Sequence, residues 1–168
     1  MTLPANMSAP LPAPPLRRRF LCMIYESLLL FAIVFVADYL FDTLTQSRQP
    51  EHLRAMRQLW LFAILGVYFV WFWTHSGQTL AMKTWRIRAV AQDGRPLSTA
   101  RAMLRYLLCW LFLLPALGLA ELLALQGWAA LGVVAIAIVL PPFYMKLDAD
   151  GQFIHDRLAR TRLVAVSA

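Results

Sequence analysis

The side chains most able to do chemistry are ionisable groups beside or inside long apolar runs. Three consecutive arginines, Arg17 to Arg19, are followed at once by an apolar run that carries Glu26 well inside it. A carboxylate within a membrane-length segment costs roughly 2.5–3.5 kcal/mol on insertion scales, so it normally has a partner or a function. Such a group can bind a proton or a cation. Glu26 is therefore the first candidate for a functional residue.

Arg19 and Glu26 are seven residues apart, which places them on nearly the same face of a helix and about 10.5 Å apart along its axis. Arginine is long and can extend along an apolar surface, but this gap is too wide for one firm bond. We therefore expect a third charged group. The segment His155-Asp156-Arg157 can supply it from the same side of the membrane. The predicted intramembrane charge cluster is Arg19, Glu26 and Asp156.

Two roles for this cluster stay open. An opposite charge lowers the pKa of a buried acid whereas burial raises it, so the cluster can be a proton relay that works near neutrality. It can also be a static ion network that holds the N-terminal segment against the first span. Residues expected to support the cluster are Arg18, His155, Arg157, Gly77, Thr79 and Lys83.

No other chemistry is indicated. Cys22 and Cys109 both lie within apolar runs and show neither metal-ligand spacing nor a disulfide framework. No nucleophile–base pair and no phosphate-binding loop accompanies them. We therefore expect no enzyme activity, no catalytic residue, no metal site and no cofactor.

The composition indicates that these groups are held in a membrane. Of 168 residues, 60% are hydrophobic and 15% are charged, against about 45–50% and 25% in soluble proteins. The net charge of +7 comes from basic residues beside the apolar runs, which favours membrane orientation over nucleic-acid binding. The lipid bilayer is thus the expected partner, and no nucleic acid is expected.

The apolar runs predict an all-α membrane protein with four transmembrane helices. A span needs about 20 apolar residues, and the predicted spans are about 20–41, 59–75, 103–125 and 128–145. The first run is too long for a signal peptide and should stay uncleaved. Five prolines predict a disordered tail over 1–16, before a transmembrane domain over 17–164 and a short C-terminal tail over 165–168.

A short β-hairpin is predicted between the second and third spans, on the cytoplasmic side. Residues 85–91 alternate between apolar and basic, and Asp93-Gly94 favours a tight turn. The basic face of this hairpin should attract anionic lipid headgroups. Residues 152–165 should form a short helix or a surface strand.

The basic residues also predict the orientation. With four spans, 13 of the 16 Lys and Arg residues lie on one side of the membrane and three on the other. By the positive-inside rule the richer side is the cytoplasm, so both termini should lie there. We expect a multi-pass protein of the bacterial inner membrane.

Several short motifs together resemble a known family. They are Arg19 to Glu26, Gly77-Gln78-Thr79-Leu80, the turn from Asp93 to Ser98, and His155-Asp156-Arg157-Leu158-Ala159 followed by Thr161. Their order and spacing around the apolar runs resemble the RDD family of prokaryotic membrane proteins, from about residue 17 to residue 164.

The family is named for one arginine and two aspartates. The resemblance places the arginine at Arg19, the first aspartate at Glu26 and the second at Asp156. Ala81 and Arg160 stand where the family often has glycine. The resemblance implies a membrane protein of largely unknown function, with transport, including cation/proton exchange, proposed for some members.

Two functions remain in competition. The first is a transporter or transport subunit that moves protons or monovalent cations. Four short spans leave little room for an enclosed path, so a homo-oligomer with a pore between protomers is expected. The second is a non-catalytic scaffold or assembly factor that binds a partner protein through the basic segment 77–101. A dry, salt-bridged Glu26 would favour the scaffold.

Overall fold

The structure is a computed structural model that describes residues 13–46, 53–144 and 152–166. Over these residues the chain is mostly helical, with one small antiparallel sheet. The elements in chain order are α1 (Leu16–Thr45), α2 (Arg54–His75), α3 (Leu80–Thr84), β1 (Ile87–Ala91), α4 (Thr99–Leu122), α5 (Gly127–Tyr144), α6 (Ile154–Leu158) and β2 (Thr161–Ala165). Most of the predicted N-terminal tail lies outside the described residues.

Long apolar helices dominate the chain. Among the described residues, three helical segments are long and apolar enough to cross a membrane: α1, the segment Arg54–Thr84, and α4. Large apolar side chains such as Phe31, Phe35 and Leu122 point outward and are more than two-thirds exposed. So many exposed apolar side chains are unfavourable in water but match lipid. The membrane character predicted from composition therefore agrees with the fold.

The fourth predicted span corresponds to α5. This helix has 18 residues, about 27 Å at 1.5 Å per residue, and its sequence is strongly apolar. Its residues 127–137 form a shorter apolar helix than the other three. The count of four spans therefore stays a prediction.

The sheet corrects the predicted hairpin. β1 pairs antiparallel with β2, in a register that runs from Ile87 opposite Ala165 to Ala91 opposite Thr161. The turn at Asp93-Gly94 does form, since the Gly94 N–H donates to the Ala91 carbonyl at 2.8 Å and Gly94 has φ +83°. The chain then starts α4 almost immediately, so no second strand can follow the turn. The end of the chain supplies the partner strand instead.

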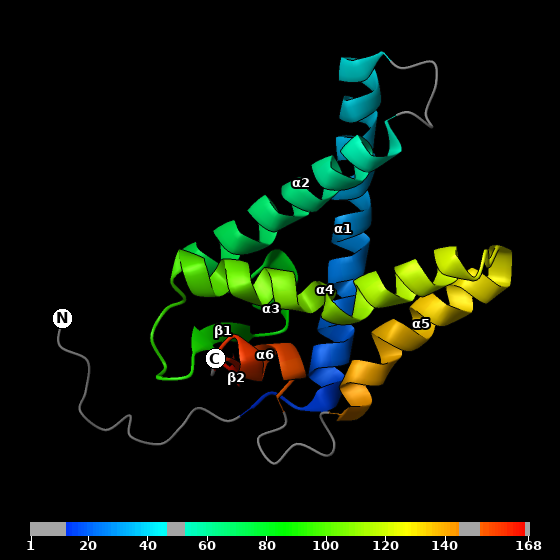
Figure 1. Ribbon diagram of the computed structural model, residues 1–168. Helices are drawn as coiled ribbons and strands as arrows, with labels where there is room; N and C mark the ends of the chain where they lie inside the picture. The colour runs from blue at the N-terminus through cyan, green and yellow to red at the C-terminus, as the bar shows by residue number, and fades with distance from the viewer. Residues whose placement is uncertain (1–12, 47–52, 145–151, 167–168) are drawn as a thin grey trace, which may run out of the picture.

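The small elements gather at one end of the long helices (Figure 1). α3, α6 and both strands lie beside the first turns of α1, the C-terminal end of α2 and the N-terminal end of α4. We call this region the sheet end. The opposite ends of the α1–α2 pair and of the α4–α5 pair point in different directions, and we call them the outer ends. They comprise residues 38–46, 53–57 and 121–127.

The buried core lies at the sheet end. Its larger members come from five elements and include Trp73, Met82, Ile87, Tyr106 and Leu163. The Tyr106 hydroxyl donates to the Phe62 carbonyl at 2.6 Å, which ties α4 to α2. The core therefore fixes α2, α3, α4 and the sheet relative to one another. These elements in turn position the polar residues of the candidate site.

Candidate functional site

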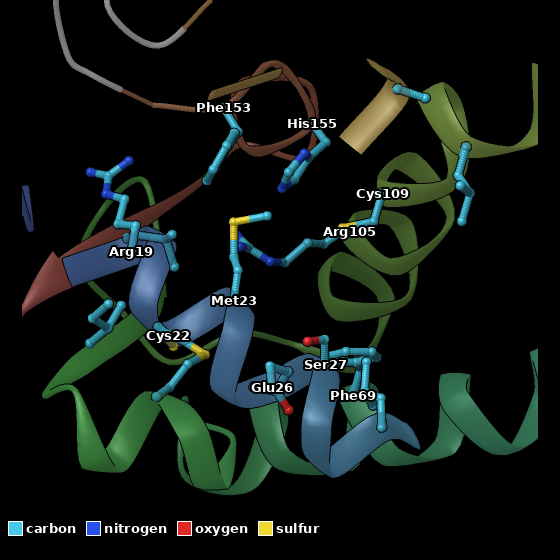
Figure 2. Close-up of a pocket in the computed structure, with 16 residues that line it drawn as sticks. Arg19, Cys22, Met23, Glu26, Ser27, Phe69, Arg105, Cys109, Phe153 and His155 are labelled. Carbon is cyan, nitrogen blue, oxygen red and sulfur yellow. The ribbon is translucent and has the colours of Figure 1, made fainter. Parts of the chain in front are cut away.

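A pocket of about 350 Å³ lies at the sheet end, where α1, α2, α4, α5 and α6 meet the sheet (Figure 2). Its size falls in the range of small-molecule sites, about 300–1,000 Å³. Its wall is mostly apolar with a few polar groups. The polar and sulfur-bearing side chains that line it are Arg19, Cys22, Met23, Glu26, Ser27, Met82, Arg105, Cys109 and His155.

A buried ion pair joins α4 to α6. Arg105 and Asp156 are 4% and 0% exposed, and the Arg105 Nη1 contacts Asp156 Oδ1. The same Nη1 donates to Thr161 Oγ1 at 2.9 Å, and the guanidinium lies 4.8 Å from the centre of the Trp73 ring. Taking both charges out of water is costly, and these added contacts offset part of that cost. Arg105 was not predicted as a member of the cluster, although it is the residue that pairs with Asp156.

Arg19 lies at the same end and is also buried, at 3% exposure. Its Nε donates to the Pro14 carbonyl at 2.9 Å. This bond ties the residues just before α1 to the first turn of the helix. The charges of Asp156 and Arg105 both act on Arg19. The structure therefore brings Arg19 and Asp156, two members of the predicted cluster, to one place.

Glu26, the third member, has different partners. The Tyr68 hydroxyl donates to Glu26 Oε1 at 2.7 Å, and the Thr79 hydroxyl donates to Oε2. In the described part of the chain, the ion pairs join other acids and leave Glu26 with these neutral donors. In Figure 2, Glu26 lies below the level of Arg105, which extends across the pocket toward α1.

The type and position of Tyr68 in the sequence are a signal for its role. A tyrosine hydroxyl inside an apolar span needs a polar partner, and Tyr68 lies in the middle of the second span. Thr79 was among the expected supporting residues. It is fully buried, and its Oγ1 also accepts from the Met82 N–H at 3.2 Å, which caps α3.

His155 lies between the pocket and the ion pair. Its ring stacks on Phe153 at 5.1 Å, and Nε2 is 3.4 Å from Asp156 Oδ1. Burial lowers the pKa of His155 to about 4; the charge of Arg105 acts in the same direction and that of Asp156 opposes it. The imidazole is therefore neutral at pH 7.

The other expected supporting residues lie around the pocket rather than in its wall. Gly77 has φ +70°, and a Cβ there would meet the Ala89 carbonyl oxygen at 3.0 Å. Its own carbonyl accepts from the Ala89 N–H at 2.8 Å, so Gly77 holds the segment with Thr79 against the sheet. The remaining three are Arg18, which is half-buried, and Lys83 and Arg157, which are exposed.

Two thiols face the pocket from opposite sides. Cys22 comes from α1 and Cys109 from α4, and both are free cysteines. Among residues 13–46, 53–144 and 152–166, no group of three or more His, Cys, Asp or Glu side chains is arranged to hold a metal ion.

Apolar helices of membrane length, a small sheet at one end and a mostly apolar pocket beside a buried ion pair define the class: a membrane protein with buried charged residues. Comparison with protein families identifies it further. The RDD family model matches residues 13–160, and the chain belongs to this family. Neither curated proteins nor solved structures give a match to the chain.

Proposed function

We propose that the protein is a transporter or transport subunit in which Glu26 binds and releases a proton or a monovalent cation. One observation carries the proposal: Glu26 lines the pocket, and its carboxyl group is held by two neutral hydroxyls, those of Tyr68 and Thr79. A carboxylate held by neutral donors can gain a proton without breaking an ion pair. An ionisable group that faces a cavity within apolar helices is typical of a transport path.

The proposal divides the predicted cluster into two parts with different roles. Arg105 and Asp156 form the static part because their buried ion pair joins α4 to α6, and the charges of both act on Arg19 at the start of α1. Glu26 forms the exchangeable part. The two roles that sequence reasoning left open for one cluster are thus assigned to separate residues.

The proposed topology places the sheet end in the cytoplasm of a bacterial cell, with α5 as the fourth span. The first turn of α1 and the strand β2 lie at this same end, which supports termini on one side (Figure 1). Most of the basic residues belong to segments of this end, as the positive-inside rule requires of a cytoplasmic face. A path through four short helices would be completed between protomers of a homo-oligomer.

A second function is favoured by the surface of the sheet end. Exposed basic side chains surround the sheet there: Lys83, Arg86, Arg88, Arg95 and Arg160. Such a surface attracts anionic lipid headgroups and also suits an acidic partner protein. A stable co-purifying protein that is lost when these residues are replaced by glutamine would favour a scaffold or assembly factor.

Proton flux in proteoliposomes tests the first proposal. We expect a sodium or potassium gradient to drive proton movement, reported by a pH-sensitive dye inside the vesicles. Glu26→Gln should reduce this flux at least tenfold. Glu121→Gln is the matched control, because Glu121 is an exposed acid at an outer end that pairs with Arg54. Full flux in Glu26→Gln, or silence of all three proteins at every pH and cation tried, overturns the proposal.

A further inference from the structure

The chain contains one short segment twice. Residues 77–91 and 151–165 can be aligned without a gap, with equivalent positions 74 residues apart. The residues that recur at equivalent positions are Gly77, Gln78, Arg86, Arg88, Val90 and Ala91. Each copy contains a five-residue helix, two connecting residues and a five-residue strand: α3 with β1 in the first copy, and α6 with β2 in the second. The two copies are therefore alike in structure as well as in sequence.

The backbone repeats in the same register. Arg86 and Arg160 directly precede the two strands and have φ +53° and +51°. Residues other than glycine rarely adopt a positive φ. The Arg86 carbonyl accepts from the Val166 N–H at 2.9 Å, and the Arg160 carbonyl accepts from the Gln92 N–H at 3.0 Å. Each arginine thus binds the residue that follows the other strand, so the two copies make reciprocal contacts.

A two-fold axis relates the copies. β1 and β2 are antiparallel, and their central pair, Ala89 opposite Leu163, joins residues that are themselves 74 positions apart. A half-turn about an axis through this pair exchanges the strands. The long helices follow the same order, with α1 and α2 before α3 and with α4 and α5 before α6. The two helix pairs extend from the sheet end in different directions (Figure 1). The chain is therefore built from two similar units.

The axis makes two helix contacts equivalent, and the structure forms one of them fully. It exchanges α2 with α5 and α4 with α1, so the packing of α2 on α4 corresponds to packing of α5 on α1. The Phe62 ring of α2 lies 5.0 Å from the Tyr106 ring and 5.3 Å from the Trp110 ring of α4. Among the described elements, α5 packs extensively on α4 alone. The pocket lies where the second contact would be, because Ser27 of α1 and Ala137 of α5 both line it.

The helices beside the pocket are suited to a closer approach. Small side chains face the pocket from both, Cys22 and Ser27 from α1 and Ala137 from α5, and small residues allow helix backbones to come close. α1, α2 and α4 each pack on at least two other elements, so α5 is held least firmly of the long helices in the described chain. Closing the pocket would bring its mostly apolar walls into van der Waals contact.

We infer that α5 moves against α1 in a second state of the protein and closes the pocket, as α2 closes the equivalent contact with α4. The inference deepens the proposed function and rests on it for the role of the movement, because a carrier alternates between open and closed forms of its site. Charged Glu26 should oppose closure, since an ionised group between apolar helices is unfavourable. A bound proton or cation would remove this obstacle. The other ionisable groups around the pocket are Arg19, Cys22, Arg105, Cys109 and His155 in its wall, and Tyr68, which holds Glu26 from α2.

Pulsed EPR distance measurements on the full-length protein in lipid nanodiscs test the movement. Spin labels are attached at Phe35→Cys on α1 and Leu131→Cys on α5, in a background where both native cysteines are replaced by alanine. The native side chains at these positions are 68% and 60% exposed, so the labels should stay outside the pocket. We expect two label-to-label distances. Glu26→Gln should increase the share of the shorter distance at least twofold.

The packed contact between α2 and α4 provides the matched control. Labels at Leu59→Cys on α2 and Leu114→Cys on α4, both at exposed positions, should give one distance with and without Glu26→Gln. A single α1–α5 distance that Glu26→Gln leaves unchanged overturns the inference. An equal change in both label pairs also overturns it, because the whole helix bundle would then be rearranging.

The native thiols give a second measurement that needs no labelled background. Cys22 and Cys109 are the only cysteines of the chain, and both line the pocket. Glu26→Gln should slow the reaction of both thiols with N-ethylmaleimide at least threefold, followed by mass spectrometry. Glu121→Gln, at an outer end, should react as the native protein does. Equal rates in all three proteins overturn the inference, even if the labelled variants fail to fold.

The remaining outcomes separate the inference from the proposed function. Movement of α5 without cation-driven proton flux supports the inference while the proposed function fails. Flux with an α1–α5 distance that never changes overturns the inference and leaves the proposed function standing.

Discussion

The sheet end and the outer ends use the same kinds of charged residue in different surroundings. At the outer ends, Arg54 and Glu121 form an ion pair whose side chains are 68% and 66% exposed. At the sheet end, the side chains of Arg105 and Asp156 are 5% and 0% exposed. Both pairs join helices that are far apart in sequence. They differ mainly in whether solvent reaches the charges.

This difference in solvent exposure determines how much each ion pair contributes to stability. Exposed pairs contribute about 0–1 kcal/mol because solvent screens them and two long side chains must be ordered. A buried pair adds little net stability over apolar packing, but removing one partner leaves an isolated buried charge and costs about 3–5 kcal/mol. Loss of one charge is therefore expected to be tolerated at the outer ends and damaging at the sheet end.

The largest effect is expected from Asp156→Asn. This substitution keeps the size of the side chain but leaves Arg105 as a buried cation without its acid. We expect the free energy of unfolding to fall by about 3–5 kcal/mol. The measurement is thermal unfolding in detergent, followed by the loss of the monodisperse peak in size-exclusion chromatography.

Asp42→Asn is the matched control. Asp42 contacts Arg57 at an outer end, and Arg57 also approaches Asp38 at 3.2 Å, so Arg57 keeps a partner in this variant. We expect the free energy of unfolding to fall by less than about 1 kcal/mol. Equal losses in Asp156→Asn and Asp42→Asn would contradict the comparison.

The second-largest expected effect is a pH dependence of stability, and its source is a residue of the sheet end. Burial lowers the pKa of His155 from 6.5 to about 4, so the unfolded chain binds more protons than the folded one between these values. Stability from this group is complete above pH 6.5 and is lost as the pH falls toward 4. At 1.36 kcal/mol per pKa unit, the loss is about 3 kcal/mol. Thermal unfolding from pH 7 to pH 4 measures it.

His155→Gln should flatten the stability profile between pH 6.5 and pH 4. His75 is exposed at the end of α2, where its ring stacks on Trp71 at 3.8 Å. His75→Gln should leave the profile of the native protein in place. A native profile in His155→Gln would show that other groups cause the acid sensitivity.

The difference between the two regions also explains which structural features could be predicted from the sequence. The long apolar helices follow from composition, because a helix that crosses a membrane needs about 20 predominantly apolar residues. The strand over residues 87–91 and the turn after it follow from local alternation and from Gly94. These features depend on neighbours in the chain, so a single sequence contains them.

The pairing of distant segments was not predictable in the same way. Arg105 and Asp156 are 51 residues apart, and β1 and β2 are separated by two long helices. Spacing along one helix linked Glu26 to Arg19, but it contained no information about Tyr68, which comes from another helix. Where several residues could pair with one polar side chain, tertiary packing determines which of them does.

A smaller effect is expected from Thr79→Val, which tests the neutral support of Glu26. The substitution removes one donor to the Glu26 carboxyl and the side-chain cap of α3. We expect the free energy of unfolding to fall by about 2 kcal/mol, because the helix cap and the buried hydrogen bond each contribute about 1 kcal/mol. Thr43→Val is the control, because exposed Thr43 donates to the Tyr39 carbonyl within α1 at 2.8 Å. A larger loss in Thr43→Val than in Thr79→Val would contradict the prediction.

The smallest effect is expected from Arg54→Gln, and it bears on the outer ends alone. Arg54 contacts Glu121 across α2 and α4, but both side chains are about two-thirds exposed. We expect the unfolding free energy to fall by less than about 1 kcal/mol, and the difference from the native protein to vanish in 0.5 M salt, where screening acts within a few ångströms. Asp156→Asn should keep its deficit in the same salt, because screening barely reaches a buried charge. A loss of 3 kcal/mol or more in Arg54→Gln that persists in salt would mean that the outer ends are shielded from water, as they would be within an oligomer.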